Sequence, residues 1–269
     1  MKQKKEKIAA VCFVPIIFFF LVGIFTCFNV FAEEESPTAS ADVAILSKYV
    51  WRGEEFSKDS IVIQPSATLS YKGLSINLWG NLDTDVYDGP YKDEAKWNET
   101  DFTLGYERSF GPLSLGAGYI YYALDSANDS KEVYLSIGAD TMLSPTLTIY
   151  REISDLSGWY INLGISHSFD LPKEMSLDLA ASAGYYYSEN DFYVEYRDDL
   201  TATTEKLRGL KYGLISVTLT VPIDKYFSVM PTIAYSFPLS SEADNFITAN
   251  SKSRDSDFFY GGVMISMSF

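Results

Sequence analysis

Cysteine and histidine are almost absent from this chain of 269 residues, which has two cysteines and one histidine. Both cysteines, Cys12 and Cys27, lie in an uncharged N-terminal run that we expect to be removed, so the mature chain would have none. A chain without cysteine has no disulfide framework and no thiolate metal site. With one histidine as well, a transition-metal cage is excluded, and we expect neither a metal nor a cofactor.

Long apolar runs are absent after the N-terminus. Residues 1–7 are basic, residues 8–30 carry no charge, and Val30 and Ala32 suit the last positions before a signal-peptidase cut. The pattern predicts a signal peptide over 1–32 and one mature domain over 33–269. An uncleaved anchor is the alternative, because the run is long enough to span a bilayer, and a lipoprotein signal at Cys27 fits less well. Since no later run approaches a membrane helix in length, a mature membrane protein would have to be a β-barrel.

Basic residues are scarce in the mature chain. Removing Lys2, Lys4, Lys5, Lys7 and Glu6 with the signal peptide leaves 17 basic and 35 acidic residues, a net charge of −18. Nucleic-acid binding demands a basic surface for the phosphate backbone, so we expect no nucleic-acid partner.

Alternation of apolar and polar residues is what the chain has in abundance. Twelve segments show the period of two that is typical of β-strands, and each is about long enough to cross a bilayer as a tilted strand. No helical period of similar quality follows the N-terminal run. The segments are 42–52, 61–71, 74–83, 100–109, 113–123, 131–140, 145–153, 159–169, 175–187, 209–221, 227–237 and 257–269.

The connectors between these segments alternate in length. Those at 72–73, 110–112, 141–144, 170–174 and 222–226 are short, whereas those at 53–60, 84–99, 124–130, 188–208 and 238–256 are longer and more polar, with 154–158 a brief exception. A soluble Greek-key sandwich has no reason to place its long loops at one end. The pattern predicts an all-β fold, an up-and-down antiparallel transmembrane β-barrel of about twelve strands with both termini periplasmic. Its apolar faces should look outward and its polar faces should line a lumen. A soluble secreted β protein is the weaker alternative.

Two stretches resemble known proteins. The last strand ends in VMISMSF, which resembles the C-terminal signature of bacterial outer-membrane barrels, and the resemblance implies that Phe269 is read by the barrel-assembly machinery. SKYVWRG at 47–53 and IQPSATLSYKGLSINLWGN at 63–81 resemble the start of the TorF-type porin family of Gram-negative bacteria. The second likeness covers about a fifth of the chain and implies location and architecture more than a substrate. The residues that carry it are Tyr49, Arg52, Gly53, Trp79 and Gly80.

Charged residues at lumen parity are the candidate site. Lys48 and Arg52 are expected to point inward from the first strand, and four acids from the fourth, sixth and ninth: Asp101, Glu107, Glu132 and Asp178. Facing charges of both signs can set selectivity in a narrow pore. They can equally form an internal ion-pair network that plugs the barrel. The acidic outer groups also suggest a mild cation preference through electrostatic steering.

Enzymatic constellations are missing. A lipid-modifying barrel places histidine and serine two apart on one face, but His167 has Ser166 and Ser168 as direct neighbours, which point the other way. The acidic loops at 83–88, 92–101, 196–200 and 253–257 could hold Ca²⁺, yet none has EF-hand spacing, and solvated loops are the simpler interpretation.

The sequence therefore predicts a non-enzymatic porin or channel of the bacterial outer membrane that passes small solutes and contacts outer-membrane lipid. Two alternatives stay open: a structural or adhesive barrel with a closed lumen, and a lipid-modifying barrel enzyme. The solute, the oligomeric state and the role of the loops 188–208 and 238–256 are not encoded in any pattern recognised above.

Overall fold

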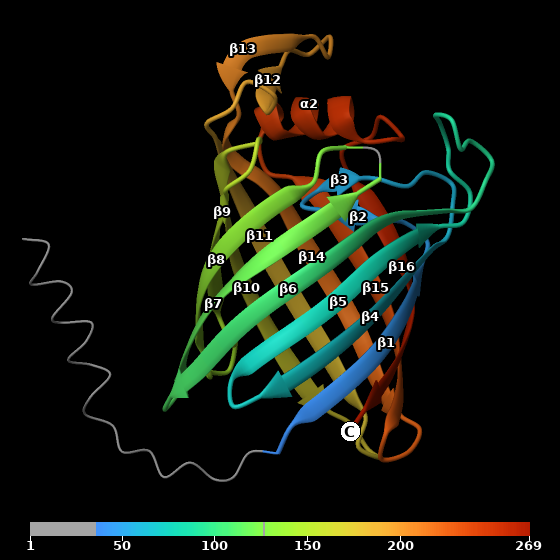
Figure 1. Cartoon of the computed structure of the whole chain (residues 1–269), viewed down its shortest axis with the longest axis vertical. Helices are drawn as coiled ribbons and strands as arrows, with labels where there is room; N and C mark the ends of the chain where they lie inside the picture. The colour runs from blue at the N-terminus through green and yellow to red at the C-terminus, as the bar shows by residue number, and fades with distance from the viewer. Residues whose placement is uncertain (1–35, 126) are drawn as a thin grey trace, which may run out of the picture. The chain divides into compact units, whose positions relative to one another are not determined.

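The computed structural model describes residues 36–125 and 127–269, so the expected signal peptide lies outside the described residues. Twelve strands close into one antiparallel barrel, in the order β1, β16, β15, β14, β11, β10, β9, β8, β7, β6, β5, β4 and back to β1 (Figure 1). This confirms the expected fold class and strand number. The barrel strands are β1 (Thr38–Leu46), β4 (Val62–Tyr71), β5 (Leu74–Asp83), β6 (Lys96–Phe110), β7 (Leu113–Leu124), β8 (Ser130–Ala139), β9 (Thr146–Glu152), β10 (Gly158–Asp170), β11 (Ser176–Ser188), β14 (Arg208–Pro222), β15 (Phe227–Pro238) and β16 (Phe258–Ser268).

Connector length separates the two ends of the barrel. The turn end has five short connectors together with the start of β1 and the end of β16, and the loop end has six connectors, most of them longer. The β4–β5 turn shows why the short ones close tightly: Lys72 and Gly73 have φ of 51° and 82°, the positive values of a two-residue hairpin turn. Elements outside the wall all belong to the loop end: β2 (Val50–Trp51), β3 (Glu54–Glu55), β12 (Val194–Tyr196), β13 (Ala202–Lys206) and α2 (Ser241–Asn250).

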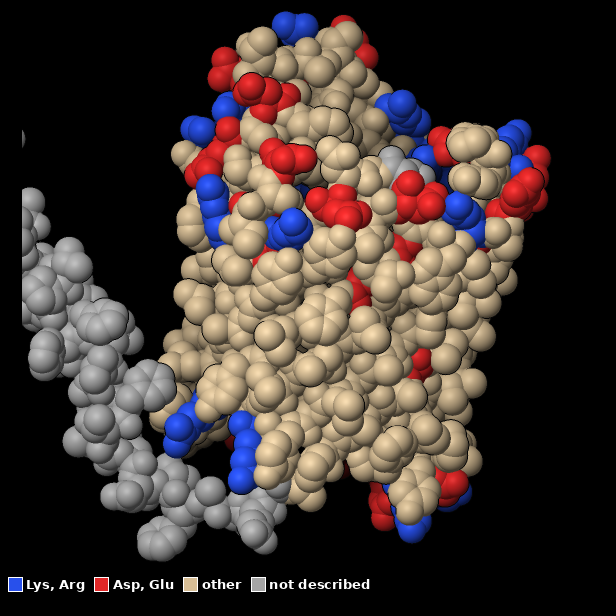
Figure 2. Space-filling view, in the orientation of Figure 1, with Lys and Arg blue, Asp and Glu red and all other residues tan. Residues whose placement is uncertain are grey.

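The outer face of the wall is apolar. Leu69, Leu135, Leu163, Ile215 and Ile233 are each half or more exposed, and in Figure 2 an almost uncharged band separates the charged residues at the two ends. The alternate positions carry mainly small and polar residues that face the lumen. A soluble barrel would bury its apolar face, so this inverted arrangement is that of a barrel whose outside meets lipid.

Two expectations about local structure are wrong. The first strand ends at Leu46 instead of residue 52, because the chain then turns into the lumen and forms the β2–β3 hairpin. One helix, α2, also exists after the N-terminal run. Ser240 caps it by accepting a hydrogen bond from the Ala243 amide at 3.1 Å, and acidic residues fill its first turn. In the described part of the chain, no helix combines the length and hydropathy that a bilayer span needs.

Candidate functional site

The segment 47–61 fills part of the lumen at the loop end. Its β2–β3 hairpin turns at Arg52 and Gly53, whose φ values of 49° and 88° match the two positive values of a type I′ turn. A Cβ on Gly53 would lie 2.7 Å from the Cβ of Tyr212 on β14. Glycine at this position therefore lets the hairpin tip approach the opposite wall.

Arg52 fastens this hairpin to the barrel. Both of its terminal nitrogens donate to the carboxylate of Glu132 on β8 at 2.7 Å, and both side chains are buried. The guanidinium also lies over the rings of Tyr160, Trp51 and Tyr150, at 4.0, 4.3 and 4.9 Å. Burial lowers the pKa of Arg52, but the charge and hydrogen bonds of Glu132 more than offset this and raise it above its ordinary value. Arg52 is thus a permanent positive charge.

One further ion pair attaches the hairpin to the wall, and another lies within the segment itself. Glu54 pairs with the fully buried Lys211 of β14, and Glu55 accepts from Lys48 at 2.5 Å and from the Ser253 amide at 2.8 Å. Three acidic or basic groups of the hairpin are therefore matched by opposite charges. Removing one partner of a buried pair costs far more than removing an exposed one, so the Glu54–Lys211 pair holds the segment against β14. The Lys48–Glu55 pair lies within the segment and stabilises its own conformation.

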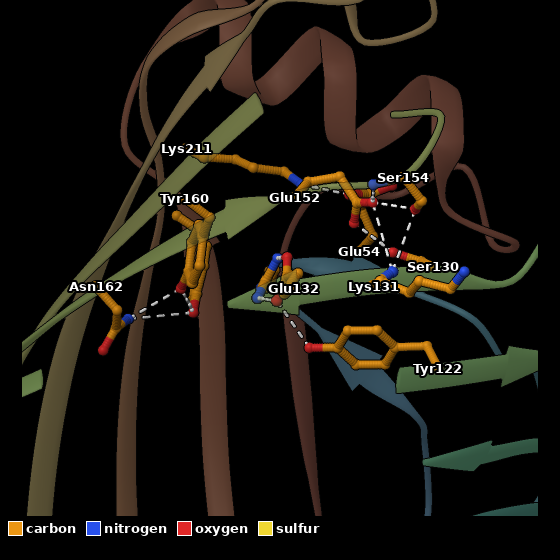
Figure 3. Close-up of polar contacts among 12 residues, drawn as sticks. Glu54, Tyr122, Ser130, Lys131, Glu132, Glu152, Ser154, Tyr160, Asn162 and Lys211 are labelled. Carbon is orange, nitrogen blue, oxygen red and sulfur yellow. Dashed lines mark hydrogen bonds and ion pairs between the residues drawn. The ribbon is translucent and has the colours of Figure 1, made fainter. Parts of the chain in front are cut away.

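Hydroxyl groups complete the polar layer around this network (Figure 3). Tyr122 donates to Glu132 at 2.9 Å, and the hydroxyls of Tyr160 and Tyr212 lie 2.6 Å apart. On the neighbouring strand, Glu152 accepts from the hydroxyls of Ser130 and Ser154. We call the layer formed by Arg52, Glu132, Tyr122, Tyr160 and Tyr212 the constriction layer.

Loops close one side of the lumen above this layer. The loop 189–207 carries β12 and β13, and the loop 239–257 carries α2, which packs on β12, β14, β15 and β3. The apolar cluster between them consists of Tyr160, Tyr186, Leu207, Tyr212, Phe246, Ile247 and Phe258. The inward segment is thus 47–61, while the two loops whose role the sequence left open form a roof over it.

A cavity of about 830 Å³ remains beside this roof. The constriction-layer residues Arg52, Glu132, Tyr122 and Tyr160 line it, and so do residues of the loops 84–95 and 153–157. This volume is in the range of small-molecule sites. We call it the vestibule.

Accessibility of the lumen-facing residues differs between the two halves of the barrel. At the loop end, Gln64, Asn81 and Ser236 are buried. Towards the turn end the inward positions are small or polar and half-buried or exposed, including Ser166 and Ser168. Water therefore reaches the wall in the half near the turn end, and the constriction layer separates that half from the vestibule.

The six expected pore-lining residues all lie on the inner side, but not all where predicted. Asp101 and Glu107 of β6, Glu132 of β8 and Asp178 of β11 face the lumen, as their alternation with outward apolar neighbours indicates. Lys48 and Arg52 do not belong to the first strand, because they follow its end and reach the lumen on the inward segment. Only Arg52 and Glu132 of the six form an ion pair with each other.

Of the five residues that carry the family resemblance, Tyr49, Arg52 and Gly53 belong to the inward segment, and Trp79 and Gly80 lie on β5. The rings of Tyr49 and Trp79 lie 5.7 Å apart, and the Tyr49 hydroxyl donates to Glu99 at 2.9 Å. Gly80 lies on the outer face under the ring of Trp97, and a Cβ there would lie 2.1 Å from that ring. Four of the five residues thus help the hairpin to dock against the wall: Tyr49, Arg52, Gly53 and Trp79. Gly80 instead makes room for Trp97 on the outer face of β5.

His167 lies on the outer face near the turn end. Its Nδ1 is 2.6 Å from the carbonyl oxygen of Met142, and its ring meets that of Phe169 edge-on. Ser166 and Ser168 face the lumen, so no histidine–serine pair forms there. No group of three or more metal-ligating side chains suited to an ion occurs in residues 36–125 and 127–269.

Several residues of the site have no clear sequence signal. Alternation assigns Glu54 and Glu55 to a loop and Lys211 to a strand. The pair between Glu54 and Lys211 joins positions more than 150 residues apart, which no local pattern indicates. The lumen tyrosines, among them Tyr160 and Tyr212, look like the aromatics of an interfacial belt. The Arg-Gly pair, which follows the apolar stretch Tyr49–Trp51, is the one available indication of the hairpin.

The fold and this site define a transmembrane β-barrel with a partly filled lumen. No family model matches the chain, and no curated protein matches it. Solved structures do match. A NanC porin aligns with a TM-score of 0.53 at 11% identity, over 85% of this chain and 98% of that one. An outer-membrane channel from Pseudomonas putida F1 aligns with a TM-score of 0.49 at 10% identity, over 88% and 97%. The calcium-bound outer-membrane phospholipase dimer of Salmonella typhi aligns with a TM-score of 0.44 at 13% identity, over 92% and 96%. At these identities the likeness concerns the fold alone.

Proposed function

We propose that this chain is a passive outer-membrane channel for small solutes, narrowed by the hairpin in segment 47–61. One observation carries the proposal: a polar, water-accessible half-lumen and an 830 Å³ vestibule meet at a single layer of side chains. A barrel built only as a scaffold has no need for polar, accessible inner walls. Solutes would cross between the rings and charges of the constriction layer, which limits their size.

Conductance of the purified full-length protein in planar bilayers tests this function. We expect discrete current steps smaller than those of open sixteen-stranded porins, because the hairpin occupies part of the section. Liposome swelling with solutes of increasing size should show a sharp upper limit. A protein that inserts but gives neither current nor swelling would refute the channel.

A closed structural or adhesive barrel is the second candidate. The observation that favours it is the hairpin itself, which is held to the wall by buried pairs from Arg52 and Glu54. Under this alternative the constriction layer is a permanent plug. It predicts no conductance for the natural protein, and conductance only after the hairpin is released.

We infer no enzymatic role for this barrel. His167 is the one histidine of the chain, and its contacts are a backbone carbonyl and the ring of Phe169. We expect the His167→Ala variant to assemble and conduct like the natural protein. Phospholipase activity that the natural protein shows and this variant lacks would support the enzyme alternative instead.

The proposed location is the bacterial outer membrane, reached through a signal peptide over 1–32 and assembled through Phe269. Membership of the TorF-type porin family is part of the same proposal, and it rests on the sequence likeness carried by Tyr49, Arg52, Gly53, Trp79 and Gly80. Deleting Phe269 should reduce the folded fraction in outer-membrane preparations, seen as loss of the heat-modifiable gel band.

A further inference from the structure

Three carboxylates face the lumen near the turn end of the barrel, below the constriction layer. Asp42 lies four residues after the first residue of β1, Glu107 three residues before the last residue of β6, and Asp178 two residues after the first residue of β11. Each of these strand ends is at the turn end of the barrel. Their chain neighbours Val43, Tyr106 and Leu179 are exposed on the outer face, which places the acids on the inner one. We call these three acids the carboxylate ring.

The ring is spread around the whole circumference. In the closed order of strands, three strands separate β1 from β11, four separate β11 from β6, and two separate β6 from β1. A solute that crosses this half of the lumen therefore passes acids on every side. Asp170, the last residue of β10, adds a further carboxylate at the rim.

The ring has no basic partner among the described residues. Asp42 accepts from the hydroxyls of Ser266 at 2.5 Å and Ser40 at 3.2 Å, and Asp178 accepts from those of Ser176 at 3.1 Å and Thr220 at 3.4 Å. Hydroxyl groups orient these carboxylates without neutralising them.

Basic residues of the barrel are engaged elsewhere. Three basic side chains that point into the lumen each form an ion pair at the loop end: Lys48 with Glu55, Arg52 with Glu132 and Lys211 with Glu54. Three cations at the turn end lie over aromatic rings at its turns or on the outer face: Lys72 over Tyr71, Arg108 over Phe110 and Lys225 over Tyr226. The fourth, Lys173, is exposed in the β10–β11 turn, outside the wall. The field in this half of the lumen is therefore that of the acids.

We propose that the carboxylate ring makes the channel selective for small cations, inorganic ions and small ammonium compounds alike. This inference rests on the proposed channel function and names its solute class. Rings of Asp or Glu in a narrow lumen with low-dielectric walls concentrate cations and exclude anions. The constriction layer contributes a balanced pair, whereas the ring contributes unbalanced negative charge.

Reversal potentials in planar bilayers under a KCl gradient test the proposal. The natural protein should prefer K⁺ over Cl⁻, and the triple variant D42N/E107Q/D178N should bring the permeability ratio at least about threefold closer to unity. The matched control is D140N/E174Q/D224N, which removes three acids from the connectors at the same end and should keep the ratio. If the triple variant fails to give the heat-modifiable band of a folded barrel, E107K alone serves, since Glu107 is exposed in the lumen and its replacement disturbs little packing.

The outcomes separate this inference from the function on which it rests. Natural protein without any current refutes the channel itself. Current that is anion-selective or non-selective, or a ratio that the triple variant and E107K leave unchanged, refutes the ring alone. A control that loses selectivity as strongly as the triple variant would also overturn it, because the effect would then come from general surface charge.

Discussion

Removing the charge of Arg52 should release the inward hairpin. In the Arg52→Met variant, Glu132 keeps the hydrogen bond from Tyr122 but loses its counter-charge while it remains buried. The two side chains of the pair are only 9% and 5% exposed, so the exposed-pair range of about 0 to 1 kcal/mol does not apply. Breaking a buried pair costs about 3 to 5 kcal/mol, and the remaining hydrogen bond favours the lower value. A loss of about 3 kcal/mol corresponds to a change of about 100-fold in the equilibrium between docked and released hairpin.

The absence of cysteine after Cys27 provides a direct assay. Ser60 lies in the same segment, is 6% exposed, and its hydroxyl has no hydrogen-bond partner among the described residues, so Ser60→Cys is a mild reporter. In this background we expect Arg52→Met to raise the labelling rate by a membrane-impermeant maleimide about 100-fold. The matched control is Arg197→Met, which removes an exposed arginine of the roof.

A second substitution separates charge from packing. Adding Glu132→Gln to Arg52→Met removes the unpaired buried charge, so labelling should fall back towards the rate of the reporter alone. A labelling rate in Arg52→Met within about threefold of the reporter, with a folded barrel, would refute the assignment of this pair as the fastening of the hairpin.

Three further predictions concern the same end of the barrel. Lys211→Met leaves Glu54 buried without its partner and should destabilise the docked hairpin by about 3 to 5 kcal/mol in the labelling assay. The control Lys252→Met breaks an exposed pair and should cost about 0 to 1 kcal/mol, and equal effects of the two variants would contradict this prediction. Gly53→Ala should raise the labelling rate strongly, because the new methyl group would collide with Tyr212. Gly89→Ala, at a similar φ of 84° but with open space around it, should leave the rate unchanged. A docked hairpin in both variants would show that the close approach of Gly53 to Tyr212 is unimportant. The ion pair with Arg151, at 2.7 Å, holds the pKa of Glu189 below its ordinary value. The stabilisation that this carboxylate gives to the loop is therefore present above about pH 4.3 and is lost as the pH falls through the lowered value. Emission of Trp159, which donates to Glu189, should change only in that acidic range, and a change between pH 5 and 7 would contradict this.

Most of the wall could be predicted from alternation because each strand satisfies a local rule. A residue on β10 such as Ile165 is apolar because it faces outward, whatever the rest of the chain does, and its neighbours follow at a period of two. The twelve strands and the two classes of connector follow from that rule and from turn residues such as Lys72 and Gly73. The inward acids Glu107 and Asp178 follow from the same parity.

The filling of the lumen could not be predicted in the same way. Alternation continues from Leu46 towards Trp51, so the sequence shows no break where the chain leaves the wall. The hairpin is inside because its charged groups find partners on strands far along the chain, such as Glu132 on β8, and such distant pairing leaves no local pattern. The helix α2 was missed for a related reason. Its ten residues are mostly polar, and it is held in place by Phe246 and Ile247, which join the apolar cluster formed with distant residues such as Tyr212.

The size of the inward side chains, as well as their polarity, decides where the pathway narrows. In an eight-stranded barrel the side chains of the wall are enough to fill the interior. A twelve-stranded barrel is wider, so its lumen is blocked only where an additional segment, here the hairpin, enters it. At the loop end, large residues such as Tyr160, Tyr186 and Tyr212 meet the hairpin and bury one another. Near the turn end, apart from the acids of the carboxylate ring, most inward positions hold serine, threonine, glycine or alanine, and water reaches the wall. Selection by size therefore belongs to the tyrosine-rich half and selection by charge to the acidic half, so each can be altered by substitutions that leave the other in place.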